Sequence, residues 1–156
     1  PAYRKLPRVW AFVGLLGLWM VISVLTAFPY FLSYYNEFIG TENGYRYIVD
    51  SNYDWGQDLK RLRDIVEQER IEKIYLDYFG GSSPRYYLGE RFEPWWSAKG
   101  PPPSGSVFAV SASTLMGAWG TYDSELAQKP EDRYDWLRGM EPTRRAGTSI
   151  FIYRMP

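Results

Sequence analysis

The feature that most limits how this chain can fold is an apolar run near its start. Residues 9–28 (VWAFVGLLGLWMVISVLTAF) contain no charged side chain, and the charge-free stretch continues to Asn36. About 20 apolar residues suffice for a helix to cross the roughly 30 Å hydrocarbon core of a bilayer. The run therefore predicts one transmembrane helix over residues 9–28.

The charges on either side of this run predict its orientation. Three basic residues lie in segment 1–8, and the first charge after the run is Glu37. Basic residues flanking a span favour the cytoplasmic side. We therefore expect a cytoplasmic flank at residues 1–8, a single pass through the cytoplasmic (inner) membrane, and an extracytoplasmic or periplasmic location for the chain after Pro29.

A cleaved signal peptide is the alternative interpretation of the same run. The run is longer than the apolar core of an ordinary signal peptide, and the sequence near Ala27 lacks a clear small-x-small cleavage site. Both observations favour a retained membrane anchor.

Residues 29–43 are expected to form an interfacial junction between the span and a domain at residues 44–156. Pro29 disfavours helical backbone at Phe28, so the span is expected to end or kink there. The aromatic residues that follow are typical of a belt at the membrane surface, with the lipid bilayer as partner: Tyr30, Tyr34 and Tyr35.

Composition excludes several kinds of chemistry. The chain has no cysteine and no histidine, which removes disulfides, thiolate nucleophiles and catalysis by Ser-His or Cys-His pairs. Lys and Arg together number 18, as do Asp and Glu, so no net charge favours nucleic acid. We expect no catalytic residue, no metal site and no cofactor within this chain.

The domain begins with a pattern typical of a βαβ unit. Alternation over residues 45–50 predicts a strand. Apolar residues at helical spacing predict a helix over residues 55–70, and residues 72–79 predict a second strand. The two strands are expected to be parallel.

Further elements follow with less regular spacing. Residues 84–88 predict a short helix that starts at Pro84 and ends at Gly89. The remaining segments are a buried strand at 106–111, a turn or short helix end at 113–117, a short helix at 130–139 and a last strand at 148–153. The predicted fold is a transmembrane helix followed by a small four-stranded, mostly parallel α/β domain.

Polar side chains are densest in residues 50–59 (DSNYDWGQDL), at the end of the first predicted strand. The carboxyl ends of strands are where α/β sheets bind ligands, so this stretch supplies candidate ligand-binding residues. A structural interpretation competes: Asp54, with Gln57 three residues later, fits a helix N-cap, and Asp58 then lies in the first turn. The candidates are Asp50, Asn52, Asp54, Trp55 and Gln57.

Two other segments carry candidate ligand contacts. Arg85 follows a Gly-Gly-Ser-Ser turn that opens a helix, an arrangement that either binds a phosphate or serves only as turn and cap. Trp95 and Trp96 lie on a proline-rich loop at residues 90–105. Paired tryptophans of this kind stack on sugars, cover the edge of their own domain, or rest in the membrane interface.

The combination of Phe28-Pro29-Tyr30, Tyr35-Asn36-Glu37, Gly44-Tyr45 and residues 50–59 resembles the C-terminal end of polytopic, lipid-carrier-dependent glycosyltransferases of the protein-mannosyltransferase-like GT-C class. Later stretches agree with it: Gly105-x-x-x-Ala109-Val110-Ser111-Ala112, Leu115-x-Gly117, Trp136-Leu137, Glu141-Pro142 and Gly147-x-Ser149-Ile150-x-x-Tyr153. The resemblance runs along nearly the whole chain and is most specific at residues 50–59. It implies an enzyme that takes a sugar from a polyprenyl-phosphate donor outside the cytoplasmic membrane. In that family the catalytic acid and the donor site lie in early membrane segments. Nothing in this sequence matches those segments, so no catalytic residue is carried over.

Two hypotheses of different classes follow. In the first, the chain is the last span and the non-catalytic cap of such a glycosyltransferase, with other transmembrane helices and polyprenyl-phosphate sugar as partners. In the second, it is a single-span accessory subunit of a larger membrane complex. A first residue other than Met, Pro1, favours a piece of a longer polypeptide. A secreted sugar-binding module is disfavoured by the span.

Overall fold

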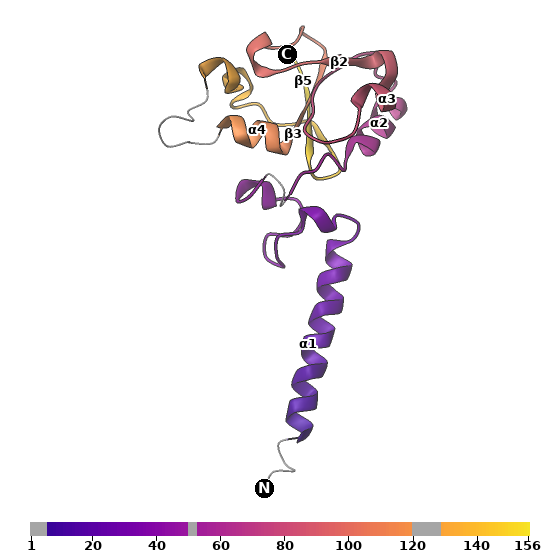
Figure 1. Cartoon of the computed structure of the whole chain (residues 1–156), viewed down its shortest axis with the longest axis vertical. Helices are drawn as coiled ribbons and strands as arrows, with labels where there is room; N and C mark the ends of the chain where they lie inside the picture. The colour runs from indigo at the N-terminus through magenta and orange to yellow at the C-terminus, as the bar shows by residue number, and fades with distance from the viewer. Residues whose placement is uncertain (1–5, 50–52, 120–128) are drawn as a thin grey trace.

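The computed structural model describes residues 6–49, 53–119 and 129–156. It consists of a long N-terminal helix, α1 (Leu6–Ala27), a short irregular junction, and a domain built on a five-stranded mixed sheet (Figure 1). The predicted α/β class with one long apolar helix is confirmed.

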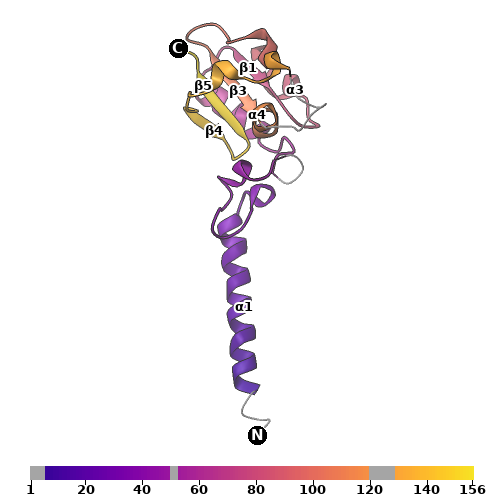
Figure 2. The same ribbon diagram turned by 90° about the vertical axis from the view of Figure 1, so that its left-hand side faces the viewer.

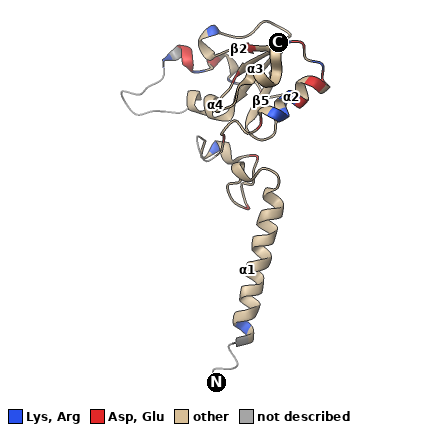
Figure 3. Cartoon of the chain, turned by 45° about the vertical axis from the view of Figure 1, so that its right-hand side comes forward, with Lys and Arg blue, Asp and Glu red and all other residues tan. Residues whose placement is uncertain are grey.

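Helix α1 has the dimensions and the surface of a membrane span. Its 22 residues extend for about 33 Å at 1.5 Å per residue. By length and composition it could cross a membrane, a test that a signal sequence also passes. Figure 3 shows that the only charge coloured along this helix lies near its N-terminal end, where Arg8 is. The helix ends at Ala27, just before Pro29, as predicted.

The strand predicted over residues 45–50 is wrong for the described part of that segment. The chain forms a 3-10 turn there, η3 (Gly44–Arg46). The amides of Tyr47 and Ile48 both donate to the carbonyl oxygen of Gly44. These local hydrogen bonds use backbone groups that a strand would offer to a neighbouring strand, so alternation of apolar residues did not produce a strand.

The helix of the predicted βαβ unit is present, although its first strand is not. Helix α2 (Leu59–Gln68) has one buried apolar face, made of Leu59, Leu62, Ile65 and Val66. It begins four residues later than predicted, because the residues before it form a turn. The strand that follows, β1 (Ile74–Asp77), lies within the predicted range.

The sheet has five strands rather than the predicted four, and it is mixed rather than mostly parallel. Its order is β2-β1-β3-β5-β4, with β1 parallel to both β2 and β3, and β5 antiparallel to both β3 and β4. The strands are β2 (Phe92–Pro94), β3 (Val107–Ser111), β4 (Arg144–Ala146) and β5 (Ile150–Arg154).

The two strands that the sequence did not predict are the two edge strands. Both β2 and β4 are only three residues long. Pro94 has no backbone N–H to donate, and an edge strand tolerates this because only one of its sides pairs with another strand. In β4, two of the three residues are the charged Arg144 and Arg145, so the sequence shows no alternation of apolar residues there. An edge strand tolerates such charged side chains.

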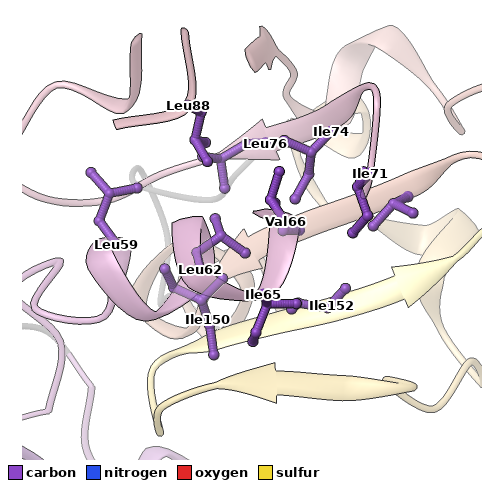
Figure 4. Packing of buried hydrophobic residues seen from close by; sticks show 13 residues of the cluster. Leu59, Leu62, Ile65, Val66, Ile71, Ile74, Leu76, Leu88, Ile150 and Ile152 are labelled. Carbon is purple, nitrogen blue, oxygen red and sulfur yellow. The ribbon is translucent and has the colours of Figure 1, made fainter. Parts of the chain in front are cut away.

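Helices cover both faces of the sheet and define two hydrophobic clusters. Helix α2 and the short helix α3 (Pro84–Leu88) cover one face, and α2 packs there against Ile74, Ile150 and Ile152 (Figure 4). Helix α4 (Ala112–Trp119) and segment 134–140 cover the other face, around Phe108. Figure 2 shows the sheet from the side on which α4 and β4 lie.

The helix predicted over residues 130–139 consists of two 3-10 turns, η8 (Pro130–Asp132) and η9 (Asp135–Leu137). Tyr134 separates them because its backbone adopts the left-handed conformation, with φ of 52°. Tyr134 and Leu137 are buried, and Trp136 is half-buried. Helix α4 is longer than the short helix end predicted for residues 113–117.

Candidate functional site

The turn before α2 lies at the carboxyl end of the parallel strands, between β1 and β3. The hydroxyl of Tyr78, just after β1, donates to the carbonyl of Gly56 at 2.9 Å. The amide of Ser113, in the first turn of α4, donates to Asp54 at 3.2 Å. Since β1 leads to α3 on one face and β3 to α4 on the other, this is the crevice where α/β sheets bind ligands. Here the chain itself lies in that crevice.

Asp54 is fully buried, and protein donors bind both of its carboxylate oxygens. Oδ1 accepts the amide hydrogen of Gly56 at 2.9 Å, and Oδ2 accepts that of Ser113. Burial raises the pKa of this carboxyl, and the two backbone hydrogen bonds oppose that shift.

The prediction that Asp54 is the N-cap of the helix is wrong. Because α2 starts at Leu59, the N-cap position belongs to Asp58, whose side chain makes no capping hydrogen bond. Gln57 is not part of a capping box either. Its Oε1 accepts the amide hydrogen of Trp55 at 2.8 Å, and its Nε2 donates to the carbonyl of Tyr53 at 3.0 Å.

Asp58 joins the start of α2 to the hairpin turn between β4 and β5. Its Oδ2 accepts the amide hydrogens of Thr148 and Ser149, each at 2.9 Å. Its Oδ1 accepts a hydrogen bond from Arg61 at 2.6 Å. The side chain is fully buried, so these donors replace the water that the carboxylate loses.

A glycine makes this approach of the carboxylate possible. Gly147 has a φ of +57°, and a Cβ there would lie 2.0 Å from Oδ1 of Asp58. Sequence patterns did not reveal this contact because the two residues are far apart in the chain.

Tyr53 and Ser33 connect the same cluster to the junction. The Tyr53 hydroxyl lies within hydrogen-bond distance of the carbonyl oxygens of Thr41, Glu42 and Thr148. Ser33 contacts the Thr148 hydroxyl and donates to the carbonyl of Tyr53 at 3.3 Å. The junction and the domain are therefore parts of one hydrogen-bonded unit.

The remaining candidates from the sequence that the structure describes lie on the surface of the domain or half-buried beneath it. Trp55 is exposed, and Asp50 and Asn52 lie outside the described residues. Arg85, on α3, is exposed, with its guanidinium 5.8 Å from the centre of the Phe92 ring.

The two adjacent tryptophans have different surroundings. Trp95 is half-buried, edge to face with Tyr75 at 4.9 Å, and its indole nitrogen donates to the carbonyl of Gly100. Trp96 is exposed, and the Lys99 ammonium lies 3.9 Å from the centre of its ring. Trp95 therefore covers the domain, while Trp96 remains available at the surface.

A hollow of about 340 Å³ that the sequence did not predict lies between α4, η3 and the start of β4. Aromatic rings of Tyr45, Trp119 and Phe151 line it, together with Arg46 and Arg145. The guanidinium of Arg145 lies 5.0 Å from the centre of the Tyr45 ring and 4.7 Å from that of Phe151. Among the described residues, the buried indole nitrogen of Trp119 has no hydrogen-bond partner.

A half-buried acid, Asp77, also lies at the end of β1. Asp77 accepts a short hydrogen bond from the hydroxyl of Tyr134. Tyr134 belongs to segment 134–140, which covers the same face of the sheet as α4. Burial raises the pKa of the Asp77 carboxyl, and the hydrogen bond from Tyr134 opposes that shift. Within the described ranges, no group of three or more Asp, Glu, His or Cys side chains is placed to hold a metal ion.

Comparison of the chain with known protein families, with curated proteins and with solved structures finds no match. The buried carboxylate of Asp54 joins the turn before α2 to α4, and that of Asp58 joins the start of α2 to the β4–β5 turn. The oxygens of both accept hydrogen bonds from the protein.

Proposed function

We propose that the chain is the last membrane span and the extracytoplasmic cap of a polyprenyl-phosphate-sugar-dependent glycosyltransferase, and that the cap is not catalytic by itself. The order of motifs along the chain, with the stretch at residues 50–59 as the most specific, supports this assignment. In this proposal α1 crosses the cytoplasmic membrane with its basic end inside, and the α/β domain lies outside.

The observation that carries the proposal is the hydrogen-bonded connection between the domain and the junction that follows α1. Ser33 and Tyr53 join the junction to the same cluster that orders α2 and the β4–β5 turn. A domain held in this way keeps a fixed height and tilt above its span. A fixed position is what a cap over a membrane-embedded active site requires.

The assignment of a non-catalytic cap rests on how the conspicuous acids are used. Asp54 and Asp58 are fully buried and accept hydrogen bonds from backbone amides. A general acid or base must reach its substrate, and these two carboxylates face other parts of the chain. The catalytic group then belongs to membrane segments elsewhere in the enzyme.

Two measurements test the proposal. The purified chain, supplied with a polyprenyl-phosphate sugar and an acceptor, is expected to transfer no sugar, and measurable transfer would contradict the non-catalytic role. The coding sequence upstream of Pro1 is expected to encode further spans, with an acidic residue in the first external loop. A start codon immediately before Pro1 would instead support the accessory subunit of a larger membrane complex.

A further inference from the structure

The loop after α1 turns back along the helix instead of continuing away from it. Figures 1 and 2 show part of the junction hanging beside the upper end of α1. Glu37 fixes this position: its carboxylate accepts hydrogen bonds from the Ser23 hydroxyl at 2.5 Å and from the Trp19 indole at 2.8 Å.

These contacts set the depth of the loop relative to the span. Ser23 lies four residues, or about 6 Å along the axis, below the helix end at Ala27. The Glu37 carboxylate therefore lies at least one turn below the point where α1 stops. The next residue, Phe38, is 92% exposed and has no apolar cover from the described part of the chain.

Other exposed apolar side chains lie close to this loop. The rings of Tyr35 and Tyr47 stack with their centres 5.6 Å apart, and Tyr47 is 63% exposed. Phe38, Tyr47 and the exposed Arg46 together line an open hollow of about 250 Å³. Phe28, Phe31 and Leu32, at the end of α1, are exposed as well.

This combination of residues matches the outer interface of a bilayer. Phenylalanine favours the acyl boundary, tyrosine favours the headgroup level, and an arginine with an apolar stem reaches lipid phosphate. Exposed apolar side chains in such number are unusual on a surface that faces only water.

We propose that the Tyr34–Gly40 loop is a re-entrant membrane anchor, whose tip, Phe38, inserts into the outer leaflet while Arg46 contacts phospholipid phosphate. This inference rests on the proposed insertion of α1 and adds a second attachment point. With two attachments the domain can neither rotate about the axis of α1 nor rise from the membrane. Glu37 serves as the clamp, because it ties the loop to Trp19 and Ser23.

The absence of native cysteine makes the test direct. Single cysteines replace Phe38, Tyr47, Leu16 or Tyr86 and carry a nitroxide label, in the full chain reconstituted into phosphatidylcholine and phosphatidylglycerol vesicles. Accessibility to oxygen, which concentrates in the bilayer, is compared with accessibility to a water-soluble nickel chelate. Tyr86, 82% exposed on α3, is the matched aqueous control, and Leu16, within α1, reports on the span.

The expected result is an oxygen-to-nickel ratio several-fold higher at positions 38 and 47 than at position 86. A ratio at Phe38 equal to that at Tyr86, with a membrane-like value at Leu16, would overturn the re-entrant anchor while leaving the anchoring by α1 intact. An aqueous value at Leu16 would overturn both. Shielding of position 38 from both reagents would show a protein contact in place of lipid and would also overturn the inference.

A second variant tests the clamp. Glu37→Ala in the chain labelled at position 38 is expected to shift the ratio towards the aqueous value, because the loop loses its hydrogen bonds to α1. Glu42→Ala, an exposed acid in the same junction, is the control and is expected to leave the ratio unchanged. Equal ratios in both variants and the parent chain would contradict the role of Glu37.

Discussion

At the scale of single residues, Asp58 carries the largest share of the connections that hold the site together. It is a buried carboxylate that accepts two backbone amide hydrogens from the β4–β5 turn and a hydrogen bond from Arg61. Removing its carboxylate leaves the amides of Thr148 and Ser149 buried without an acceptor, whereas Arg61 is partly exposed to water. Stability should therefore depend on this residue more than on any surface acid.

Replacing Asp58 with Ala is predicted to lower the free energy of unfolding by about 2–6 kcal/mol, since two buried backbone amides lose their acceptor and each unsatisfied donor costs about 1–3 kcal/mol. The measurement is urea unfolding of the detergent-solubilised chain, followed by tryptophan fluorescence. Asp64→Ala is the control: Asp64 is half-exposed, and its ion pair with Arg63 is worth about 0–1 kcal/mol. Similar midpoints for the two variants would show that the Asp58 network is not needed for the fold.

A pair of glycines separates backbone strain from steric contact. Gly147 and Gly139 both have positive φ, at +57° and +83°, but a Cβ meets nothing within 4 Å at Gly139. Gly139→Ala is predicted to cost about 1–2 kcal/mol from the left-handed backbone alone. Gly147→Ala should cost clearly more in the same unfolding assay, because its methyl group would overlap Asp58. Equal losses of unfolding free energy in the two variants would show that the left-handed backbone, and not the overlap with Asp58, accounts for the whole effect.

At this scale the sequence located the important stretch but not the roles within it. The polar density at residues 50–59 singled out the stretch that contains Asp54 and Asp58, although the described part of the segment just before it does not form the expected strand. It could not show that Asp54 bonds to α4 or that Asp58 bonds to the β4–β5 turn. Both partners are distant in sequence, and a local capping pattern accounts equally well for Asp54 and Gln57.

At the scale of elements, the junction and the β4–β5 turn form one unit around Tyr53. Its ring is fully buried and its hydroxyl reaches carbonyl oxygens on both sides, from Thr41 and Glu42 in the junction and from Thr148. A phenylalanine would preserve the packing and leave these carbonyls without this donor.

Tyr53→Phe is predicted to destabilise the attachment of the junction by about 1 kcal/mol, the net worth of an ordinary hydrogen bond. Hydrogen exchange of the backbone amides of Arg46, Tyr47 and Ile48 is expected to accelerate roughly fivefold. Tyr86→Phe, which changes an exposed hydroxyl on α3, should leave those amides unchanged. Unaltered exchange in Tyr53→Phe would show that packing alone holds the junction.

The link between β1 and segment 134–140 has a pH dependence of defined sign. Burial raises the pKa of Asp77, so the folded chain retains a proton where the unfolded chain, with an ordinary pKa of about 3.9, has released it. The contribution of Asp77 to stability is thus present below that pH and is lost as the pH rises through the folded pKa.

Asp77→Asn is predicted to flatten this pH dependence, since the amide oxygen still accepts the hydrogen bond from Tyr134 but has no proton to lose. Unfolding free energies measured from pH 4 to pH 7 should fall less steeply in the variant than in the parent chain. If the free energy of unfolding changed equally with pH in the two proteins, the pH dependence would belong to other acids, such as the buried Asp54.

Elements with a strong periodic pattern were predictable, and elements that depend on neighbours were not. Helix α2 and strand β1 have buried residues at regular spacing, whereas β3 and β5 are almost continuously buried runs, and all four were located from the sequence. Strands β2 and β4 are short edges whose pairing depends on the adjacent strand. The false strand at residues 45–50 shows the opposite case, where alternation was present but local hydrogen bonds prevailed.

At the scale of the whole molecule, three features lie in sequence along one axis: an apolar helix, a junction rich in aromatic residues, and an α/β domain (Figure 1). The apolar run at residues 9–28 predicted the helix, and Pro29 with the aromatic residues after it predicted the junction, because both features depend on local composition. It could not predict that the junction turns back onto α1 through Glu37, which depends on a contact between residues 14 and 18 positions apart.

We propose that α1 holds the domain on the extracytoplasmic face of the membrane. Two variants test it on intact cells with an impermeant maleimide: Ala2→Cys, which keeps all three basic residues of the N-terminal flank, and Lys129→Cys, at an exposed position of the domain. Lys129→Cys is expected to be labelled on intact cells, and Ala2→Cys only after the membrane is made permeable. Labelling of Ala2→Cys alone on intact cells would contradict it.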